Sequence, residues 1–235
     1  MRSTVRFRCR VMPVTATNTS VAPPDELILV GRSSSHFTRV ARLFAAEAEV
    51  PYVLRVVPNL LSCDPRDFGD NPALRIPVLR TAQGDWYGSV NVCRELVRRT
   101  KRSLRVVWPE ELHEPLLASA QELVLGAMAT EVSLILARAA REGSQDRAGT
   151  PSPHEVKMKQ SLEGSLAWLD ARAEQLIERL PPRDVSYLEV TLFCLVTHLS
   201  FRDVLPVSQY ENLAAFCRRF GERSSARVTA YHFDA

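Results

Sequence analysis

The spacing of apolar and polar residues changes character near the middle of the chain. In roughly the first hundred residues, short β-branched runs alternate with stretches of helical periodicity, whereas from Pro109 onward the spacing is helical almost throughout. The clearest unit is Glu26–Ala48, where an apolar run over 27–31 is followed by three serines at 33–35 and then by apolar residues that share one helical face. The sequence therefore predicts an α/β region followed by an all-helical region.

Four strands are expected in the first region. They cover residues 27–31, 52–57, 75–80 and 85–88. A helix joins the first two, which makes them parallel, and the tight turn at 83–85 makes the last two an antiparallel hairpin. Pro77 suits the start of a strand, and a cis peptide there would leave the backbone of Ile76 unpaired. The order β-α-β-α-β-β-α, closed by a helix that Ser89 caps, predicts a mixed four-stranded sheet with helices, a thioredoxin-like layout.

The second region has the pattern of a helical bundle. Long helices are expected over 110–141, 154–180, 187–202 and 210–223. The third begins with the S-x-x-E capping box at Ser186 and is apolar on nearly every face, so it belongs at the centre of the bundle. We divide the chain into a disordered tail at 1–24, a first domain at 25–104 and a helical domain at 109–235. Residues 224–235 are expected to be irregular and laid over the surface.

Composition and charge favour a soluble globular protein over a nucleic-acid-binding or membrane protein. With 235 residues, 46% hydrophobic and 24% charged, the chain has the composition of a soluble globular protein, and no apolar run reaches the length that spans a bilayer. The formal charge is +3, but residues 1–24 contribute +4 from four arginines and no acid, so the remainder carries 3 − 4 = −1. We therefore expect neither a nucleic-acid partner nor a membrane partner, and we interpret the basic stretch 98–105 as a solvated helix end.

Cysteines and metal-binding motifs add two further expectations. Five cysteines are scattered without a CxxC pair, which indicates a reducing, cytoplasmic location. The acidic segment 110–114 lacks the helical ligand pair of an HExxH motif, and His198 on the apolar helix is expected to be a hydrogen-bonded core histidine. We expect no metal.

The turn at the three serines offers chemistry of its own. A helix that begins there presents unpaired N–H groups and the positive end of its dipole, which favour an anion. The hydroxyls of Ser33, Ser34 and Ser35 either cap the helix or donate a hydrogen bond to a thiolate. Lowering a thiol pKa from ~8.5 to ~6.5 requires about 2.7 kcal/mol, and one hydrogen bond to the charged sulfur supplies roughly 1.5–3 kcal/mol. One hydroxyl is therefore sufficient without a general base.

Four local motifs, in this order along the chain, resemble those of the glutathione S-transferase superfamily. They match the entry to the first helix, the V/I-P-x-L segment with its cis-proline, the E/D-S-x-x-I-x-x-Y-L helix start and the second-domain capping-box helix with its closing segment. The corresponding residues are 35–40, 76–79, 88–96, and 186–202 with 212–225. The resemblance covers about Glu26 to Thr229 and implies a thioredoxin-like domain followed by an all-helical domain.

The resemblance implies a role for particular residues. Glutathione would be the co-substrate, with Ser35, Ser34 or Ser33 stabilising its thiolate. The residues expected to bind glutathione are Arg75, Ile76, Pro77, Gly88 and Ser89. The residues expected to line the pocket for a small hydrophobic electrophile are His36, Phe37, Met128, Glu131 and Val132. The family also implies a homodimer and a role in detoxification.

Two departures from the family pattern favour an alternative. Gly88 stands where the family usually has Glu or Asp to pair with the glutathione ammonium, and the loss of that bond costs about 1.5–3 kcal/mol. Asp85 or Asn91 would be the nearest substitutes. His36 stands where proline is usual. The alternative to a transferase is a non-catalytic binding or scaffold protein that keeps the fold and binds glutathione weakly or not at all.

Overall fold

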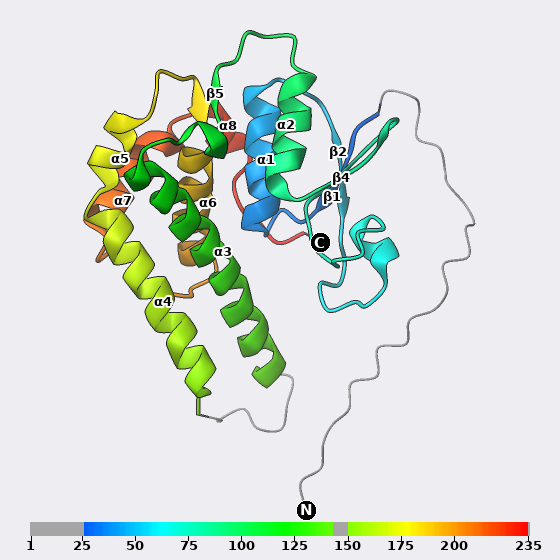
Figure 1. Cartoon of the computed structure of the whole chain (residues 1–235). Helices are drawn as coiled ribbons and strands as arrows, with labels where there is room; N and C mark the ends of the chain where they lie inside the picture. Colours follow the sequence, from blue (N-terminus) through cyan, green and yellow to red (C-terminus); the bar gives the residue numbers. More distant parts are fainter. Residues whose placement is uncertain (1–25, 143–149, 235) are drawn as a thin grey trace, which may run out of the picture.

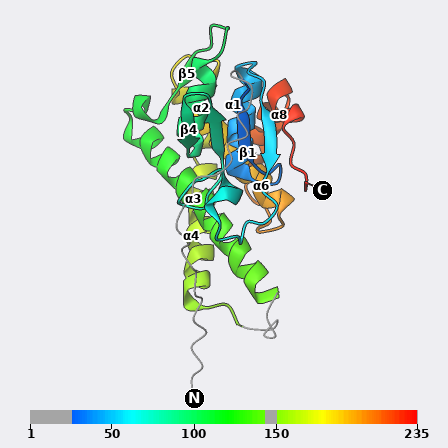
Figure 2. The ribbon, with the colours of Figure 1, turned by 90° about the vertical axis from the view of Figure 1, so that its right-hand side faces the viewer.

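The computed structural model describes residues 26–142 and 150–234 (Figure 1). The predicted tail at 1–24 lies outside this range. The elements of the first half are β1 Ile28–Gly31, α1 His36–Glu47, β2 Val53–Val56, the 3₁₀ helix η1 Pro65–Phe68, β3 Val78–Thr81, β4 Gly84–Tyr87 and α2 Ser89–Arg98. Helices α1 and α2 pack together on the face of the sheet that is turned toward the helical half (Figures 1 and 2).

The sheet has the order β2-β1-β3-β4, with β1 parallel to β2 and antiparallel to β3, and with β3 antiparallel to β4. The predicted mixed four-stranded sheet is therefore confirmed. The register pairs Val30 with Val78, and Val78 with Tyr87. The chain after β1, the chain before β3 and the chain after β4 consequently meet at one end of the sheet.

The second half is helical, as predicted, apart from one short strand pair. Its elements are β5 Val106–Val107, η2 Pro109–Glu111, α3 Pro115–Glu142, α4 Pro153–Asp170, α5 Ala173–Arg179, β6 Val185–Ser186, α6 Tyr187–Phe201, α7 Glu211–Gly221 and α8 Ser224–Val228. Strands β5 and β6 pair in parallel and tie the connector to the start of α6. Two-residue strands are too short to produce a periodic pattern, and for this reason they were not predicted.

The single helix expected over 154–180 is two helices. It ends at Asp170, whose carboxylate accepts a hydrogen bond of 2.9 Å from the backbone N–H of Leu213 in α7. Arg172 then leaves the helical conformation at φ −125° before α5 begins. This contact with a residue far along the chain overrides a local pattern that continues through the break.

Helix α6 forms the centre of the core, as predicted, and α1 and α3 pack against it. One continuous apolar core joins the face of the sheet that carries α1 and α2 to the helical half, and a smaller cluster of Val30, Val57, Phe68 and Val78 covers the other face. Ser186 caps α6 by accepting a hydrogen bond of 3.0 Å from the backbone N–H of Glu189. The Glu189 carboxylate binds Arg183 and the Ser186 hydroxyl, so only the first half of the predicted capping box forms.

Helix α3 corrects the expectation about apolar runs. By length and composition alone, one stretch of it, Pro115–Ala139, is apolar enough to cross a membrane, with a mean hydropathy of 1.4. Within this stretch the Glu131 carboxylate is buried and paired with His36 and His198. The polar partners of this carboxylate therefore come from the protein's own core.

Candidate functional site

The turn that begins α1 lies at the end of the sheet where three segments meet. Ser35 is the N-cap, and its Oγ accepts a hydrogen bond of 3.3 Å from the backbone N–H of Thr38. Capping uses a lone pair of the hydroxyl oxygen and leaves the O–H proton free to donate to another group. Ser35 is half-buried, whereas Ser33 and Ser34 are only 1% and 7% exposed. Among the three serines, Ser35 is therefore the one best placed to face a ligand.

The backbone groups of the other two serines are occupied. The Ser34 carbonyl accepts a hydrogen bond of 2.9 Å from Nε2 of His198. The Ser33 N–H donates a hydrogen bond of 2.9 Å to the Asp234 carboxylate, which also lies 3.9 Å from Nε of Arg32. The turn thus holds an anionic group, in line with the electrostatics of a helix start.

The segment that supplies this anion corrects the expectation for the C-terminus. Residues 224–228 form α8, and the chain then returns to the start of α1 and is not simply laid over the surface (Figure 1). The Tyr231 hydroxyl donates to the Cys194 carbonyl at 2.8 Å, and the ring of Phe233 lies 4.8 Å from that of Phe201. The Asp234 side chain is 8% exposed. We call residues 229–234 the C-terminal strap, and through Asp234 this strap is part of the site.

The second segment is Ile76–Pro77, whose peptide bond is cis, as expected. Pro77 is buried and Ile76 is half-buried. Within residues 26–142 and 150–234, no hydrogen bond occupies the backbone N–H or C=O of Ile76. Arg75 is exposed, and its carbonyl accepts a hydrogen bond of 2.8 Å from Nδ2 of Asn71.

The third segment is Gly88–Ser89 at the start of α2. Gly88, at φ 82°, is the N-cap and Ser89 is the first helical residue, which corrects the expectation that Ser89 caps the helix. No side chain caps α2, so its first N–H groups are open. The Ser89 hydroxyl lies 2.7 Å from that of Tyr187 in α6, and burial raises the pKa of Tyr187, which therefore stays protonated.

Neither candidate substitute for the missing acid at Gly88 is free in the part of the chain that the structure describes. Asp85 faces Arg80 at 3.6 Å, and Nδ2 of Asn91 donates to the Tyr87 carbonyl at 3.1 Å. Both candidate substitutes are therefore engaged elsewhere. The positive φ of Gly88 also disfavours any residue with a side chain at this position. The backbone conformation at this turn is therefore suited to glycine and not to the usual Glu or Asp.

The residues predicted to line the electrophile pocket are mostly buried. Met128 is fully buried in the core, and Phe37 and Val132 are half-buried. His36 and Glu131 are buried and bound to each other, with Nδ1 of His36 3.0 Å from Oε2 of Glu131.

His198 completes this buried cluster. Its Nδ1 lies 2.7 Å from Oε1 of Glu131, and both of its ring nitrogens have partners, as expected of a core histidine. Burial by itself would raise the pKa of Glu131, but the hydrogen bonds from His198 and His36 hold that pKa below its ordinary value. Burial lowers the pKa of His36, and its hydrogen bond to Glu131 offsets only part of this effect. The pairing was not predicted, because its members come from three separate elements.

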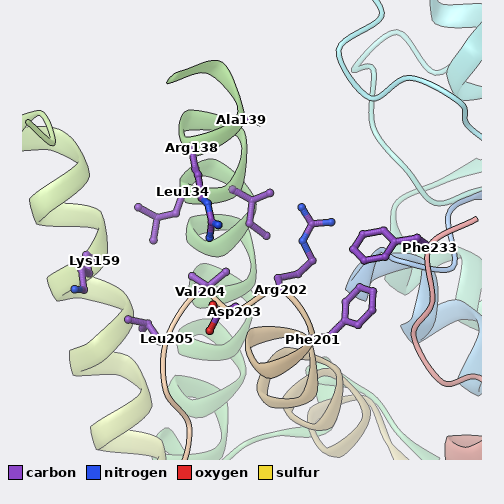
Figure 3. A pocket seen from close by; sticks show the side chains of 11 residues that line it. Leu134, Arg138, Ala139, Lys159, Phe201, Arg202, Asp203, Val204, Leu205 and Phe233 are labelled. Carbon is purple, nitrogen blue, oxygen red and sulfur yellow. The ribbon is translucent and has the colours of Figure 1, made fainter. Parts of the chain in front are cut away.

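A cavity of about 420 Å³ lies beside the site, between α3, α4, the loop after α6 and the C-terminal strap (Figure 3). None of the five predicted electrophile-pocket residues lines it. Its lining is partly apolar, with cationic groups on α3, α4 and the end of α6, and includes Leu134, Arg138, Lys159, Phe201, Arg202, Asp203, Leu205 and Phe233. Phe233 lines the cavity and the next residue, Asp234, contacts the serine turn, so cavity and turn are neighbours.

Cys194 and the basic residues at the end of α2 offer no reactive group to the site. Cys194 is fully buried, and burial raises its pKa to about 12, so it is not a reactive thiol. Arg98 and Arg99 both bind Glu95, and Arg102 binds Glu49 at 2.8 Å. These pairs agree with the interpretation of the basic stretch as a solvated helix end.

Comparison with known proteins gives structural matches only. No protein-family model and no curated protein matches the sequence. A glutathione S-transferase of Methylobacillus flagellatus with glutathione bound is similar at a TM-score of 0.67 and 22% identity, over 88% of this chain and 100% of that chain. One of Methylobacterium radiotolerans in complex with glutathione sulfonate has a TM-score of 0.66 and 20% identity, over 89% and 97%. The Tau-class enzyme of mango has a TM-score of 0.57 and 15% identity, over 88% and 93%. The chain has the glutathione S-transferase fold.

Proposed function

We propose that this protein is a glutathione transferase, which holds glutathione as its thiolate for attack on a small hydrophobic electrophile. The observation that carries the proposal is the sheet register. It brings the serine turn of α1, the open backbone of Ile76 and the uncapped start of α2 to one end of the sheet. Two of the similar structures contain glutathione or glutathione sulfonate, which supports the same reading.

Each segment has a task in this proposal. The free N–H and C=O of Ile76 pair with the backbone of the cysteinyl part of glutathione, as a neighbouring strand would. The open N–H groups at the start of α2 donate hydrogen bonds to the γ-glutamyl carboxylate, for which a helix N-terminus is a suitable anion site. The Ser35 hydroxyl caps α1 through its oxygen and donates its proton in a hydrogen bond to the sulfur. The thiol proton passes to solvent, and the thiolate attacks an electrophilic carbon; with a chlorodinitrobenzene-type substrate the new sulfur–carbon bond replaces the carbon–chlorine bond, and chloride leaves.

We place the electrophile in the cavity beside the C-terminal strap, in place of the predicted pocket residues, which are largely in the core. Phe201 and Phe233 supply apolar surface there, and Arg202 lies over the ring of Phe233 at 5.4 Å. An apolar lining with a few polar groups is typical of small-molecule pockets. Figure 3 shows these side chains together with Lys159 on α4.

Two observations favour the alternative, a non-catalytic binding protein with this fold. Gly88 and its surroundings offer no acid for the glutathione ammonium. The Asp234 carboxylate already occupies the N–H of Ser33 at the turn where the thiolate would lie. A protein that keeps the fold but has its anion site filled by its own chain would bind glutathione weakly.

Isothermal titration of glutathione distinguishes the two. For a transferase we expect binding at sub-millimolar concentration, weakened in Ser89→Pro, which removes one of the open N–H groups at the first position of α2, and unchanged in Ser103→Ala, an exposed serine away from the site. Activity with a chlorodinitrobenzene-type substrate should accompany binding. If neither the wild type nor Asp234→Asn binds glutathione at millimolar concentration, the transferase proposal is wrong and the binding protein stands.

The resemblance extends the proposal to assembly and location. We propose a cytoplasmic homodimer with a role in detoxification, built from a first domain at 25–104 and a second at 109–235. Sedimentation equilibrium tests the dimer, and limited proteolysis tests a domain boundary between residues 104 and 109.

A further inference from the structure

The buried cluster of His36, Glu131 and His198 joins three helices. His36 is the first residue of α1, Glu131 lies within α3 and His198 lies near the end of α6. Helix α6 packs against both α1 and α3 (Figure 1). Their side chains are 1%, 0% and 4% exposed, so bulk water does not solvate the cluster.

The hydrogen-bond partners of His198 define where its proton lies. Its Nε2 faces the Ser34 carbonyl at 2.9 Å, and a carbonyl only accepts, so Nε2 carries a hydrogen. In a neutral imidazole Nδ1 then has a lone pair. That lone pair faces a carboxylate oxygen of Glu131 at 2.7 Å. Two lone pairs at this separation repel each other, so a cation is required between them, either a proton or a metal ion.

The donor set around that position is that of a metal site. Nδ1 of His36 approaches the second oxygen of the same carboxylate at 3.0 Å, and one ligand atom from each of the three residues lies within 4.8 Å of the other two. Two imidazoles and one carboxylate bind divalent first-row transition ions. A tetrahedral zinc ion with bonds of about 2.0–2.1 Å holds its ligand atoms roughly 3.3 Å apart. The contacts of 3.0 Å and 2.7 Å are shorter than this spacing by about 0.3 Å and 0.6 Å, and the ligand atoms of the three residues lie up to 4.8 Å apart, so the side chains must shift by such amounts to hold the ion.

The surroundings of His198 also fit a ligand. Metal-bound histidines usually donate their other ring N–H to a carbonyl or a carboxylate, which fixes the tautomer and orients the ring. The bond from Nε2 of His198 to the Ser34 carbonyl has this form. It also links the cluster directly to the serine turn.

We propose that His36, Glu131 and His198 form a buried site for a divalent transition-metal ion of the zinc type. The ion is held by Nδ1 of both histidines and the Glu131 carboxylate, and three protein ligands leave a further coordination position. This departs from the expectation of no metal. Ligands that are 95 and 67 positions apart along the chain produce no spacing motif, so sequence inspection did not find them. The proposal does not depend on the transferase activity.

The test uses the full chain after removal of metal by a chelator, with Zn²⁺ and Co²⁺ as probes. We expect one ion bound per chain, a rise in thermal stability with Zn²⁺, and a Co²⁺ d–d spectrum typical of nitrogen and oxygen ligands. His198→Gln and Glu131→Gln should bind at least about 10–100-fold more weakly, since loss of an outer-shell partner alone typically costs that much. His113→Gln, an exposed histidine outside the cluster, is the matched control and should bind as the wild type does.

Three outcomes overturn the proposal. The wild type binds neither ion and gains no stability, in which case a proton holds the cluster together. The Co²⁺ spectrum shows thiolate charge transfer, which places the ion on cysteines. Binding is unchanged in both cluster variants. Because the spectrum and stoichiometry are measured on the wild type, the test remains decisive even where a variant fails to fold.

Discussion

Replacement of Ser35 separates two roles that one hydroxyl can fill. In the structure its oxygen caps α1 by accepting from the Thr38 N–H at 3.3 Å, and in the proposed mechanism its proton is donated to the glutathione sulfur. Ser35→Ala removes both interactions. Loss of the cap lowers the free energy of unfolding by about 1 kcal/mol.

The second loss acts on the thiol. A hydrogen bond to a charged sulfur is worth about 1.5–3 kcal/mol, so its removal raises the pKa of bound glutathione by about 1.1–2.2. With a wild-type value of ~6.5, the thiolate fraction at pH 6.5, and with it the rate, falls roughly 7- to 80-fold. At pH 8.5 the same change lowers the rate by less than about 3-fold, because roughly 40–90% of the thiol is then ionised even in the variant.

The assay is the pH profile of kcat/KM for a chlorodinitrobenzene-type substrate, with the thiol pKa read from the ultraviolet absorbance of the bound thiolate. Ser35→Gly is the matched control for stability, because glycine replaces a serine cap at a cost of only a few tenths of a kcal/mol. It should lose as much activity as Ser35→Ala while retaining more stability. Ser33→Ala tests a buried neighbour and should keep the wild-type profile.

The reasoning fails if Ser35→Ala and Ser35→Gly both keep the wild-type thiol pKa and rate at pH 6.5. A loss confined to Ser33→Ala or Ser34→Ala would move the role to another serine of the turn. Loss of activity that is equal at pH 6.5 and pH 8.5 would indicate a positional effect rather than thiolate stabilisation.

Three further predictions concern groups around the site. Asp234→Asn keeps an acceptor for the Ser33 N–H but removes its charge, so the KM for glutathione should fall roughly 2- to 5-fold; a rise would show that the carboxylate assists binding. Ser89→Ala leaves the buried Tyr187 hydroxyl without its partner and should lower the free energy of unfolding in urea by about 1–3 kcal/mol. In a Tyr187→Phe background the same substitution should cost clearly less, and equal costs would contradict this coupling. Burial alone would raise the pKa of Glu47, but the hydrogen bonds from Arg223 and Ser225 hold this pKa below its ordinary 4.5. The ionised Glu47 carboxylate therefore stabilises the fold above pH 4.5, and this contribution is lost as the pH falls through the lowered pKa. Glu47→Gln should therefore lower Tm at pH 7 with a difference that closes in acid, and a difference independent of pH would refute the assignment.

Local patterns in the sequence were sufficient to predict the architecture. Alternation of short apolar runs with helical periodicity located β1 to β4, and the all-round apolar character of 187–202 placed α6 at the centre of the core. Such patterns arise because burial of one face imposes a period of 2.0 or 3.6 on neighbouring residues, and that information is contained within a few turns of chain. The cis-proline at Pro77 and the serine cap at Ser35 are equally local, and the structure contains both.

Only the tertiary structure decided which side chains pair when they lie far apart along the chain. The Asp234 carboxylate reaches the N–H of Ser33 across 201 positions, and the Ser89 hydroxyl meets Tyr187 across 98. Glu131 lies in a largely apolar stretch of α3, and its two histidine partners come from two other helices. A buried polar group must find a partner wherever the packed helices bring one, because leaving it unpaired costs about 1–3 kcal/mol. The sequence shows that such a group exists, whereas helix packing decides which residue satisfies it, and in this protein that choice assembles both the strap over the serine turn and the cluster proposed to bind a metal.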